Sequence, residues 1–391
     1  MEKEPAKVPV TVITGFLGSG KTTLLNHILS QQHGLKIAVI ENEFGEVGVD
    51  DALLKQNKKA KLSGEEEIIE MNNGCICCTV RGDLIKFLNK LKSRKLDLIL
   101  IETTGLADPA PVAQTFFVDD SVREHYKLDS ILTVVDSKHI IMHLDEVKPE
   151  GVENESVEQV AFADVILLNK IDLVTREEIE AIKKKIFEIN GGVDIIETLN
   201  SKVDIGAILG KDTFSLERVL DMDPNFLVDM EHQHDLSVTS VGFSFDYELE
   251  MFKLQNLIQK LIEEKGTDLY RYKGVLPVKG MDQKFVFQGV HMLFGGTFCE
   301  EWAEDEPRKG RFIFIGKNLD KDEITKAFLW CKAKPLRFKV GDQVVVMMKG
   351  GYKPGEVIRC WDEGNAYRVR LTSGVNVWAP DDNDDFIKQR S

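Results

Sequence analysis

The sequence predicts an α/β fold with a mostly parallel sheet, followed by a small α+β region and a C-terminal all-β region. Apolar, β-branched stretches that alternate with helical patterns before residue 200 predict the first part. An alternating strand at 237–245 and an amphipathic helix at 251–264 predict the second. Short strands between glycine-containing turns beyond Pro335 predict a small SH3-like β-barrel.

The first element is a glycine-rich run at 15–22, which matches the phosphate-binding pattern G-x-x-x-x-G-K-[ST]. It follows an apolar stretch at 8–14 and precedes a helical pattern at 22–29, the context that the pattern requires. Lys21 would reach the β- and γ-phosphates and act in catalysis, and the Thr22 hydroxyl would ligate Mg²⁺. The remaining residues of the loop would contact phosphate through turned backbone N–H groups and short side chains: Gly15, Gly18, Ser19, Gly20 and Thr23.

A second motif, Asn169-Lys170-Ile171-Asp172, follows a strand-like stretch at 163–168. At a strand end it resembles the guanine-specificity element of GTPases. We expect the Asp172 carboxylate to accept from guanine N1 and N2, the Lys170 stem to cover the base, and Asn169 to brace the loop. Adenine lacks this donor pair and would leave a buried Asp172 unpaired, so the motif favours GTP over ATP.

Acidic residues follow two further strands. The apolar strand at 96–101 ends in Glu102, where a carboxylate suits a role in holding Mg²⁺ and in catalysis, and Gly105 would let a backbone N–H approach the γ-phosphate. Glu43, in the loop that follows a strand at 36–40, is a further catalytic candidate that could face Mg²⁺, the attacking water or a transported metal. A solvated acidic loop is the alternative for this segment.

Three cysteines lie within four residues, at Cys75, Cys77 and Cys78. Thiolates bind soft or borderline metals such as Zn²⁺. A structural zinc site has four ligands, but the other cysteines are isolated and are expected to pack as small apolar side chains, at 299, 331 and 360. A site of three thiolates is open and suits a metal that must leave. A redox pair and an inert buried cluster are the alternatives.

Together these motifs resemble the CobW-type family of P-loop GTPases, a group of zinc and cobalt metallochaperones related to the nickel-insertion GTPases. The segments that carry the resemblance are 15–22, 41–49 (E-N-E-F-G-E-V-G-V), 74–78 (G-C-I-C-C), 102–109 (E-T-T-G-L-A-D-P) and 169–172. Residues 237–331 also resemble the family's smaller C-terminal domain. The resemblance implies slow GTP hydrolysis coupled to metal binding and delivery.

The chain departs from the family pattern in three places. It has no long His-rich tract between the domains, only His232 and His234 in a polar linker, and its N-terminus lacks the Cys-Pro docking motif of the eukaryotic zinc-transferase members. The resemblance therefore does not identify the client protein. The C-terminal β region is not part of the family pattern, and either partner docking or a passive appendage would fit it.

These observations predict a GTP-hydrolysing metallochaperone that binds Zn²⁺, or Co²⁺, through its three cysteines and delivers it to a client metalloprotein. GTP or GDP and Mg²⁺ would be its other ligands, and GTP would assemble the metal site. One alternative is a nickel-type maturation GTPase. Another is a GTP-gated scaffold in which the C-terminal barrel binds the partner and the cysteines sense redox state.

Composition narrows the class of protein. A net charge of −15 and a pI near 5.1 argue against binding of nucleic acid or anionic membranes. The apolar runs have the length of strands, and the chain carries no pattern of a secretory signal, so we expect a cytoplasmic protein in a reducing compartment. The sequence does not decide between a monomer and a homodimer.

The expected domains are 8–219 for the GTPase, 220–235 for the linker, 236–332 for the α+β domain and 335–391 for the barrel. Within the first, Thr175 and Glu178 predict a capping box ahead of a helix with a buried isoleucine stripe. His139 and His143 are expected to be structural. An acidic stretch at 299–307 is expected to be a surface loop.

Overall fold

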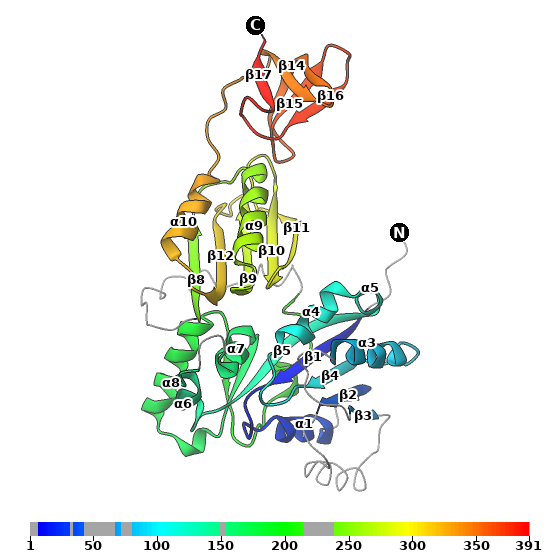
Figure 1. Cartoon of the computed structure of the whole chain (residues 1–391), viewed down its shortest axis with the longest axis vertical. Helices are drawn as coiled ribbons and strands as arrows, with labels where there is room; N and C mark the ends of the chain where they lie inside the picture. The colour runs from blue at the N-terminus through cyan, green and yellow to red at the C-terminus, as the bar shows by residue number, and fades with distance from the viewer. Residues whose placement is uncertain are drawn as a thin grey trace. The chain divides into compact units, whose positions relative to one another are not determined.

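The computed structural model describes residues 7–31, 34–42, 67–71, 80–148, 153–214 and 238–390. The chain divides into two compact units, the first consisting mainly of Met1–Arg218 and the second mainly of Val241–Phe314 and Asn318–Ser391. The first contains a seven-stranded sheet and the second contains two five-stranded sheets (Figure 1). In the described part of the chain, no helix has the length and apolar character needed to cross a membrane.

The sheet of the first unit has the strand order β3-β2-β4-β1-β5-β6-β7, and every neighbouring pair is parallel. The predicted parallel α/β fold is therefore confirmed. Its strands are β1 (Val8–Thr14), β2 (Ile37–Asn42), β3 (Glu67–Met71), β4 (Leu98–Glu102), β5 (Tyr126–Asp136), β6 (Val165–Asn169) and β7 (Asp194–Glu197). Since the strands are parallel, their carboxyl ends lie at one edge of the sheet, where ligands bind in open α/β folds.

Helices connect these strands: α1 (Lys21–Ser30), α3 (Val80–Leu91), α4 (Ala110–Val118), α5 (Asp120–Arg123), α6 (Ile140–Leu144), α7 (Glu155–Phe162) and α8 (Arg176–Ile189). Two 3₁₀ turns, η1 (Ile171–Leu173) and η2 (Ile205–Ala207), complete the unit. Leu24, Leu25 and Ile28 of α1 are buried in one core with strand residues. The capping box of α8 is present, and the predicted stripe of isoleucines, Ile179, Ile182, Ile186 and Ile189, is buried.

The second unit begins with an α+β domain. Its elements are β8 (Val238–Phe245), α9 (Met251–Lys265), β9 (Leu269–Pro277), β10 (Gln283–Val290), β11 (Leu293–Glu301), β12 (Gly310–Lys317) and α10 (Lys321–Trp330). The sheet has the order β11-β10-β9-β12-β8. Its core is aromatic, and the rings of Phe312 and Phe328 stack with centroids 4.1 Å apart.

The prediction of a surface loop at 299–307 is wrong for the first residues of this segment. Cys299 to Glu301 continue β11, because the ladder to β10 extends as far as the pair Gln283 and Glu301. Trp302 is only 8% exposed, and its backbone N–H donates to Asp282 O at 2.9 Å. The acidic composition of this segment suggested a loop, but its backbone is paired in a strand.

The C-terminal β domain contains β13 (Gln343–Met348), β14 (Gly351–Asp362), β15 (Asn365–Leu371), β16 (Asn376–Ala379) and β17 (Ile387–Gln389). Their order is β16-β15-β14-β13-β17, with antiparallel pairing throughout. The β region expected from the turn spacing is present. The strand β17 was not predicted from the sequence, because it has only three residues.

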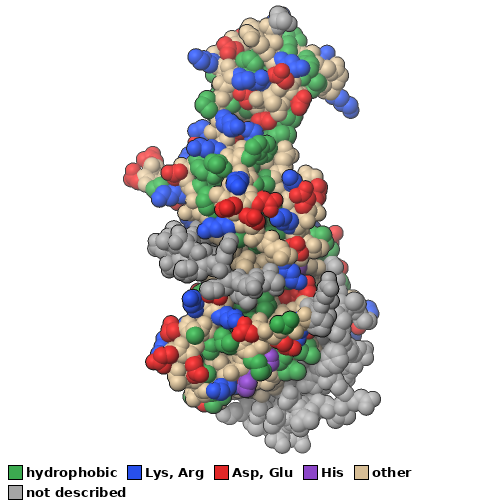
Figure 2. All heavy atoms as spheres, turned by 60° about the vertical axis from the view of Figure 1, so that its left-hand side comes forward, with side chains coloured by type: hydrophobic (Ala, Val, Ile, Leu, Met, Phe, Trp, Pro, Cys, Tyr) green, Lys and Arg blue, Asp and Glu red, His purple; other side chains and the backbone are tan. Residues whose placement is uncertain are grey.

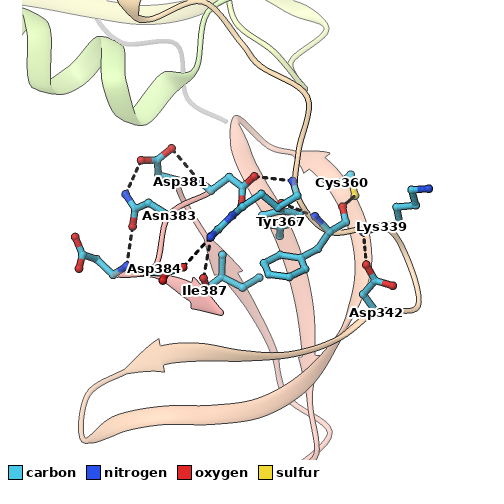
Figure 3. A network of polar contacts seen from close by, with 12 residues as sticks. Lys339, Asp342, Cys360, Tyr367, Asp381, Asn383, Asp384 and Ile387 are labelled. Carbon is cyan, nitrogen blue, oxygen red and sulfur yellow. Dashed lines mark hydrogen bonds and ion pairs between the residues drawn. The ribbon is translucent and has the colours of Figure 1, made fainter. Parts of the chain in front are cut away.

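A polar network fixes the start of this domain to the loop before β17 (Figure 3). The Arg337 backbone N–H and Nε donate to the two carboxylate oxygens of Asp382 at 2.7 and 2.8 Å, and Nη1 donates to Asp384 at 2.7 Å. Its Nη2 donates to the Ile387 carbonyl at 3.1 Å. The guanidinium therefore bonds three different residues on one segment, and these charge-assisted bonds help to hold so short a final strand in register.

Candidate functional site

The glycine-rich loop between β1 and α1 has positive φ angles at three glycines, and two of them, Gly15 and Gly20, leave no room for a side chain. Gly15, Gly18 and Gly20 have φ values of 134°, 72° and 113°. A Cβ on Gly15 would lie 2.1 Å from the Val134 carbonyl oxygen, and one on Gly20 would lie 2.5 Å from Asn169 Nδ2. Gly20 is also the residue that precedes the first turn of α1. The loop therefore curves tightly against β5 and β6 and leads into the N-terminus of α1, where backbone N–H groups favour an anion.

Two polar side chains in this loop fit a polyphosphate. Lys21 is 8% exposed, and its Nζ donates to the carbonyl oxygens of Gly15 and Phe16 at 2.8 and 3.2 Å. Ser19 is fully buried, and its Oγ has no hydrogen-bond partner among the described residues. A buried hydroxyl without a partner is costly, and a phosphate oxygen would satisfy it.

Thr22 and Glu102, the two residues predicted to hold Mg²⁺, lie within hydrogen-bond distance of each other. Thr22 Oγ1 donates to Glu102 Oε1 at 3.3 Å. The two side chains meet because β1 and β4 are neighbours, with Ile13 opposite Glu102 in the ladder. Hydroxyl and carboxylate oxygens are the hard ligands that Mg²⁺ prefers. The other catalytic candidate, Glu43, lies outside the described residues.

The segment after β4 packs against the phosphate loop. The Thr103 backbone N–H donates to the Ile13 carbonyl at 2.9 Å, which continues the ladder to β1. A Cβ on Gly105 would lie 2.6 Å from the Leu17 backbone nitrogen. Only glycine permits this close approach, so Gly105 lies directly beside the phosphate loop.

Gln159 on α7 holds this segment in place, a role that was not predicted from the sequence. Its Nε2 donates to the carbonyl oxygens of Gly105 and Ala107 at 3.1 and 3.3 Å. The side chain is only 2% exposed. The sequence offered one signal for this role: a glutamine among mostly apolar residues of a helix. Such a glutamine is expected to be buried, and a buried amide needs specific hydrogen-bond partners.

Asn169 joins the phosphate loop to the loop after β7. Its Nδ2 donates to Ser19 O and to Ser201 Oγ, each at 2.9 Å, and its Oδ1 accepts from the Ser201 backbone N–H at 2.9 Å. Ser201 Oγ in turn donates to Gly20 O at 3.0 Å. Asn169 therefore has the bracing position expected of it.

Lys170 and Asp172 follow at the surface. Lys170 has a left-handed backbone with φ of 62°, and its Nζ donates to Gly18 O at 2.7 Å and to Asp136 Oδ2 at 2.8 Å. Burial raises the pKa of Asp136, but hydrogen bonds from Lys170 and His139 outweigh it and hold that pKa below its usual value. Asp172 is exposed on η1, so the expectation of a buried carboxylate is wrong for this structure. The 3₁₀ turn carries the chain out from β6 to the surface at this point.

A cavity of about 40 Å³ lies behind the phosphate loop, lined by Phe16, Thr133, Asp136, His139, His143 and Gln159 among others. The rings of Phe16 and His143 have centroids 3.9 Å apart, and burial lowers the pKa of His143. His139 Nδ1 lies 3.0 Å from Asp136 Oδ2. Within the described ranges, no three His, Cys, Asp or Glu side chains group as metal ligands.

The three clustered cysteines, Cys75, Cys77 and Cys78, lie outside the described residues, as do His232 and His234. The isolated cysteines are free thiols at Cys299, Cys331 and Cys360. Cys331 is fully buried, and burial raises the pKa of its thiol to about 12. A neutral buried thiol is a poor metal ligand, in keeping with the packing role predicted for it.

The glycine loop, the buried lysine and the bracing asparagine together define a P-loop nucleotide-binding domain. The chain belongs to the CobW/HypB/UreG family: the profile of that family's nucleotide-binding domain matches residues 9–197. The profile of the cobalamin synthesis protein cobW C-terminal domain matches residues 238–332.

Relatives of similar length share most of the chain. The zinc chaperone YjiA of Escherichia coli is 36% identical over 82% of this chain and 98% of its own. The zinc-regulated GTPase metalloprotein activator 1 of Schizosaccharomyces pombe is 35% identical over 80% of this chain and 83% of its own. A crystal structure of Zn(II)-bound YjiA GTPase from E. coli matches with a TM-score of 0.65 and 30% identity, covering 84% of this chain and all of that one.

Proposed function

We propose that this protein is a GTPase that binds a zinc ion and delivers it to a client metalloprotein. The names of relatives that align over most of the chain support the zinc and GTPase parts of this function. The single observation that carries the nucleotide part is the glycine loop in which Lys21 and Ser19 are buried, since both are the partners that phosphate oxygens need.

Guanine is the proposed base. Asn169 fixes the loop that follows β7 to the phosphate loop, and this bracing aligns the start of η1 with the phosphate site. Asp172 is exposed and is able to accept from the two guanine donors when the nucleotide binds. The Lys170 stem, anchored at its Nζ by Gly18 and Asp136, would cover one face of the base.

The residues that would hold the phosphates and Mg²⁺ lie in the glycine-rich loop, at the start of α1 and at the end of β4. Gly15, Gly18, Gly20 and Thr23 would contribute backbone or hydroxyl contacts to phosphate, and Thr22 and Glu102 would hold Mg²⁺. Bound Mg²⁺ would neutralise charge on the β- and γ-phosphates. Lys21 would exchange its bonds to the Gly15 and Phe16 carbonyls for phosphate oxygens. The Gly105 N–H would face the γ-phosphate, and Glu43 would orient the attacking water.

Zinc is the proposed cargo, and Co²⁺ is a second candidate because thiolate and imidazole sites accept both. The proposed ligands are Cys75, Cys77 and Cys78. They follow β3, which is parallel to β2, and β2 is parallel to β4. The chain therefore leaves β3 at the sheet edge where Glu102 lies. This placement supports coupling between the γ-phosphate and the cysteines.

The remaining parts of the proposal concern the whole chain. We place the domains at 8–219, 236–332 and 335–391, with a linker at 220–235. A cytoplasmic location, a homodimer and the identity of the client belong to the proposal as well. The zinc-based names of the relatives favour zinc over the nickel alternative.

Metal stoichiometry and GTP turnover of the reduced full chain test this function. We expect Zn²⁺ to bind more tightly with a non-hydrolysable GTP analogue than with GDP, and GTP to bind more tightly with Zn²⁺ by the same factor, since the coupling is reciprocal. Cys77→Ser with Cys78→Ser should remove the coupling and keep metal-free GTP binding. Equal zinc affinity in both nucleotide states would favour a scaffold over a chaperone, and equal affinity for ATP and GTP would refute the guanine assignment.

A further inference from the structure

The C-terminal end of α10 exposes two large apolar side chains in the α+β domain. The helix buries Ile324 and Phe328 in the core. Its last two residues, Leu329 and Trp330, are 51% and 54% exposed. A helix that needed only to cover the sheet would carry polar residues on this second face. Exposed tryptophan beside exposed leucine is instead typical of a contact surface.

These two side chains line an open groove of about 530 Å³ together with three lysines, Lys326, Lys332 and Lys334. None of the three forms an ion pair with a carboxylate in the described part of the chain. The nearby carboxylates of Glu250 and Asp381 lie 2.7 and 4.0 Å from Lys253 and offset its charge instead. The groove therefore has an apolar floor and a rim with excess positive charge, and the forward face of this unit in Figure 2 shows hydrophobic and basic side chains next to each other.

Contacts with adjacent segments of the same chain hold the groove in shape. Leu249 and Lys332 form an isolated antiparallel bridge. The Ala333 N–H donates to Glu248 O at 2.9 Å, and the Lys334 N–H donates to Glu250 Oε1 at 3.2 Å. Lys253 Nζ lies 5.6 Å from the centre of the Trp330 ring, which limits the orientations of that ring. A preformed surface loses little conformational entropy when a partner binds.

We infer that this groove binds a segment of a partner protein in which an apolar side chain is flanked by carboxylates. The apolar anchor would lie against Leu329 and Trp330, and the carboxylates would pair with the lysines of the rim. Charge complementarity selects the acidic flanks, because a basic segment would leave all three lysines unpaired beside like charge. A nucleic acid fits less well, because the net charge of the chain is −15.

An unbiased library of phage-displayed dodecapeptides, selected on the immobilised full chain, tests this inference. Each recovered peptide is then labelled and its binding measured by fluorescence anisotropy against the unchanged protein and variants. We expect peptides with Asp or Glu around an apolar residue, whose binding weakens as salt is added. Trp330→Ser should weaken binding by roughly thirtyfold, the loss typical of an aromatic anchor.

Matched lysine variants localise the site. Lys326→Ser with Lys332→Ser should abolish most of the binding, whereas Lys339→Ser with Lys349→Ser, which removes the same charge from the C-terminal β domain, should leave it unchanged. The urea denaturation midpoint should be unchanged in all variants, which reports that they are folded, and GTP turnover should also be unchanged. Recovery of no peptide that depends on the groove, recovery of basic peptides, or groove-dependent binding of a twelve-nucleotide oligouridine would overturn the inference.

Discussion

Thr22 Oγ1 donates a hydrogen bond to Glu102 Oε1 across 3.3 Å, which joins the first turn of α1 to the carboxyl end of β4. The two residues are 80 positions apart in the chain, and only the β1 to β4 ladder brings them together. A hydroxyl and a carboxylate this close together offer two of the oxygen ligands that the proposed Mg²⁺ site requires.

Glu102→Gln should therefore raise the Mg²⁺ concentration needed for GTP hydrolysis and lower the maximal rate by about tenfold or more, because the amide keeps the size of the side chain and loses its charge. The measurement is GTP turnover over a range of Mg²⁺ concentrations. Glu124→Gln, at the exposed end of α5, is the matched control and should behave like the unchanged protein. An unchanged Mg²⁺ dependence in Glu102→Gln would exclude Glu102 from the metal site.

Gln159→Leu tests whether α7 positions the segment that follows β4. The leucine removes both donated bonds and leaves the Gly105 and Ala107 carbonyls without this partner, so the free energy of unfolding should fall by roughly 1–3 kcal/mol. The preference for a GTP analogue over GDP should also fall, since Gly105 would no longer be held toward the γ-phosphate. Urea denaturation and nucleotide titration measure the two effects. Gln259→Leu, on the exposed face of α9, is the control; a stability loss with unchanged nucleotide preference would limit Gln159 to a packing role.

Asn169→Ala should weaken GTP and GDP binding by similar factors. Its amide holds Ser19 and Ser201 together, and that bracing serves the loop whichever nucleotide is bound. The lost bonds should also lower the free energy of unfolding by roughly 2–3 kcal/mol. Isothermal titration with each nucleotide checks the ratio. A selective loss of GTP would contradict a bracing role.

Asp172→Asn should behave differently, because Asp172 is exposed on η1 and lies outside that bracing network. Stability should be unchanged, while the ratio of GTP to ATP affinity should fall by about tenfold or more, as a charged acceptor for two guanine donors is lost. Competition between the two nucleotides measures this ratio. A preserved ratio would show that another residue reads the base.

The sequence predicted the parts of this structure that depend on short-range patterns. Gly15, Gly18 and Gly20 could be placed because the loop conformation requires them, and the strands before residue 200 could be placed from continuous apolar runs. The contacts of Gln159 could not be predicted, because its partners lie more than fifty positions away and a glutamine in a helix has no periodic signature. The strand β17 was missed because three residues are too few to show alternation, and its register depends on Arg337.

Acidic residues near α7 make the stability of the first unit depend on pH. Burial, a hydrogen bond that protonated Glu158 donates to the Glu153 side chain, and the charge of Asp108 raise the pKa of Glu158 to about 9. Burial likewise raises the pKa of Asp108 to about 6. Each carboxyl binds its proton more tightly in the folded chain than in the unfolded chain. Their contribution to stability is therefore greatest below about pH 4 and is lost as the pH rises, for Asp108 up to about 6 and for Glu158 up to about 9.

Glu158→Gln should remove the larger part of this dependence. The amide is neutral at every pH and can still donate a hydrogen bond to Glu153, so the free energy of unfolding at pH 7 should rise by an amount on the order of 2 kcal/mol. The difference from the unchanged protein should disappear near pH 4 and grow toward pH 9. Urea denaturation at pH 5, 7 and 9 measures it, with Glu124→Gln as the exposed control. A variant that is less stable than the unchanged protein at pH 7 would show that Glu158 is ionised in the folded chain and stabilised there by a cation.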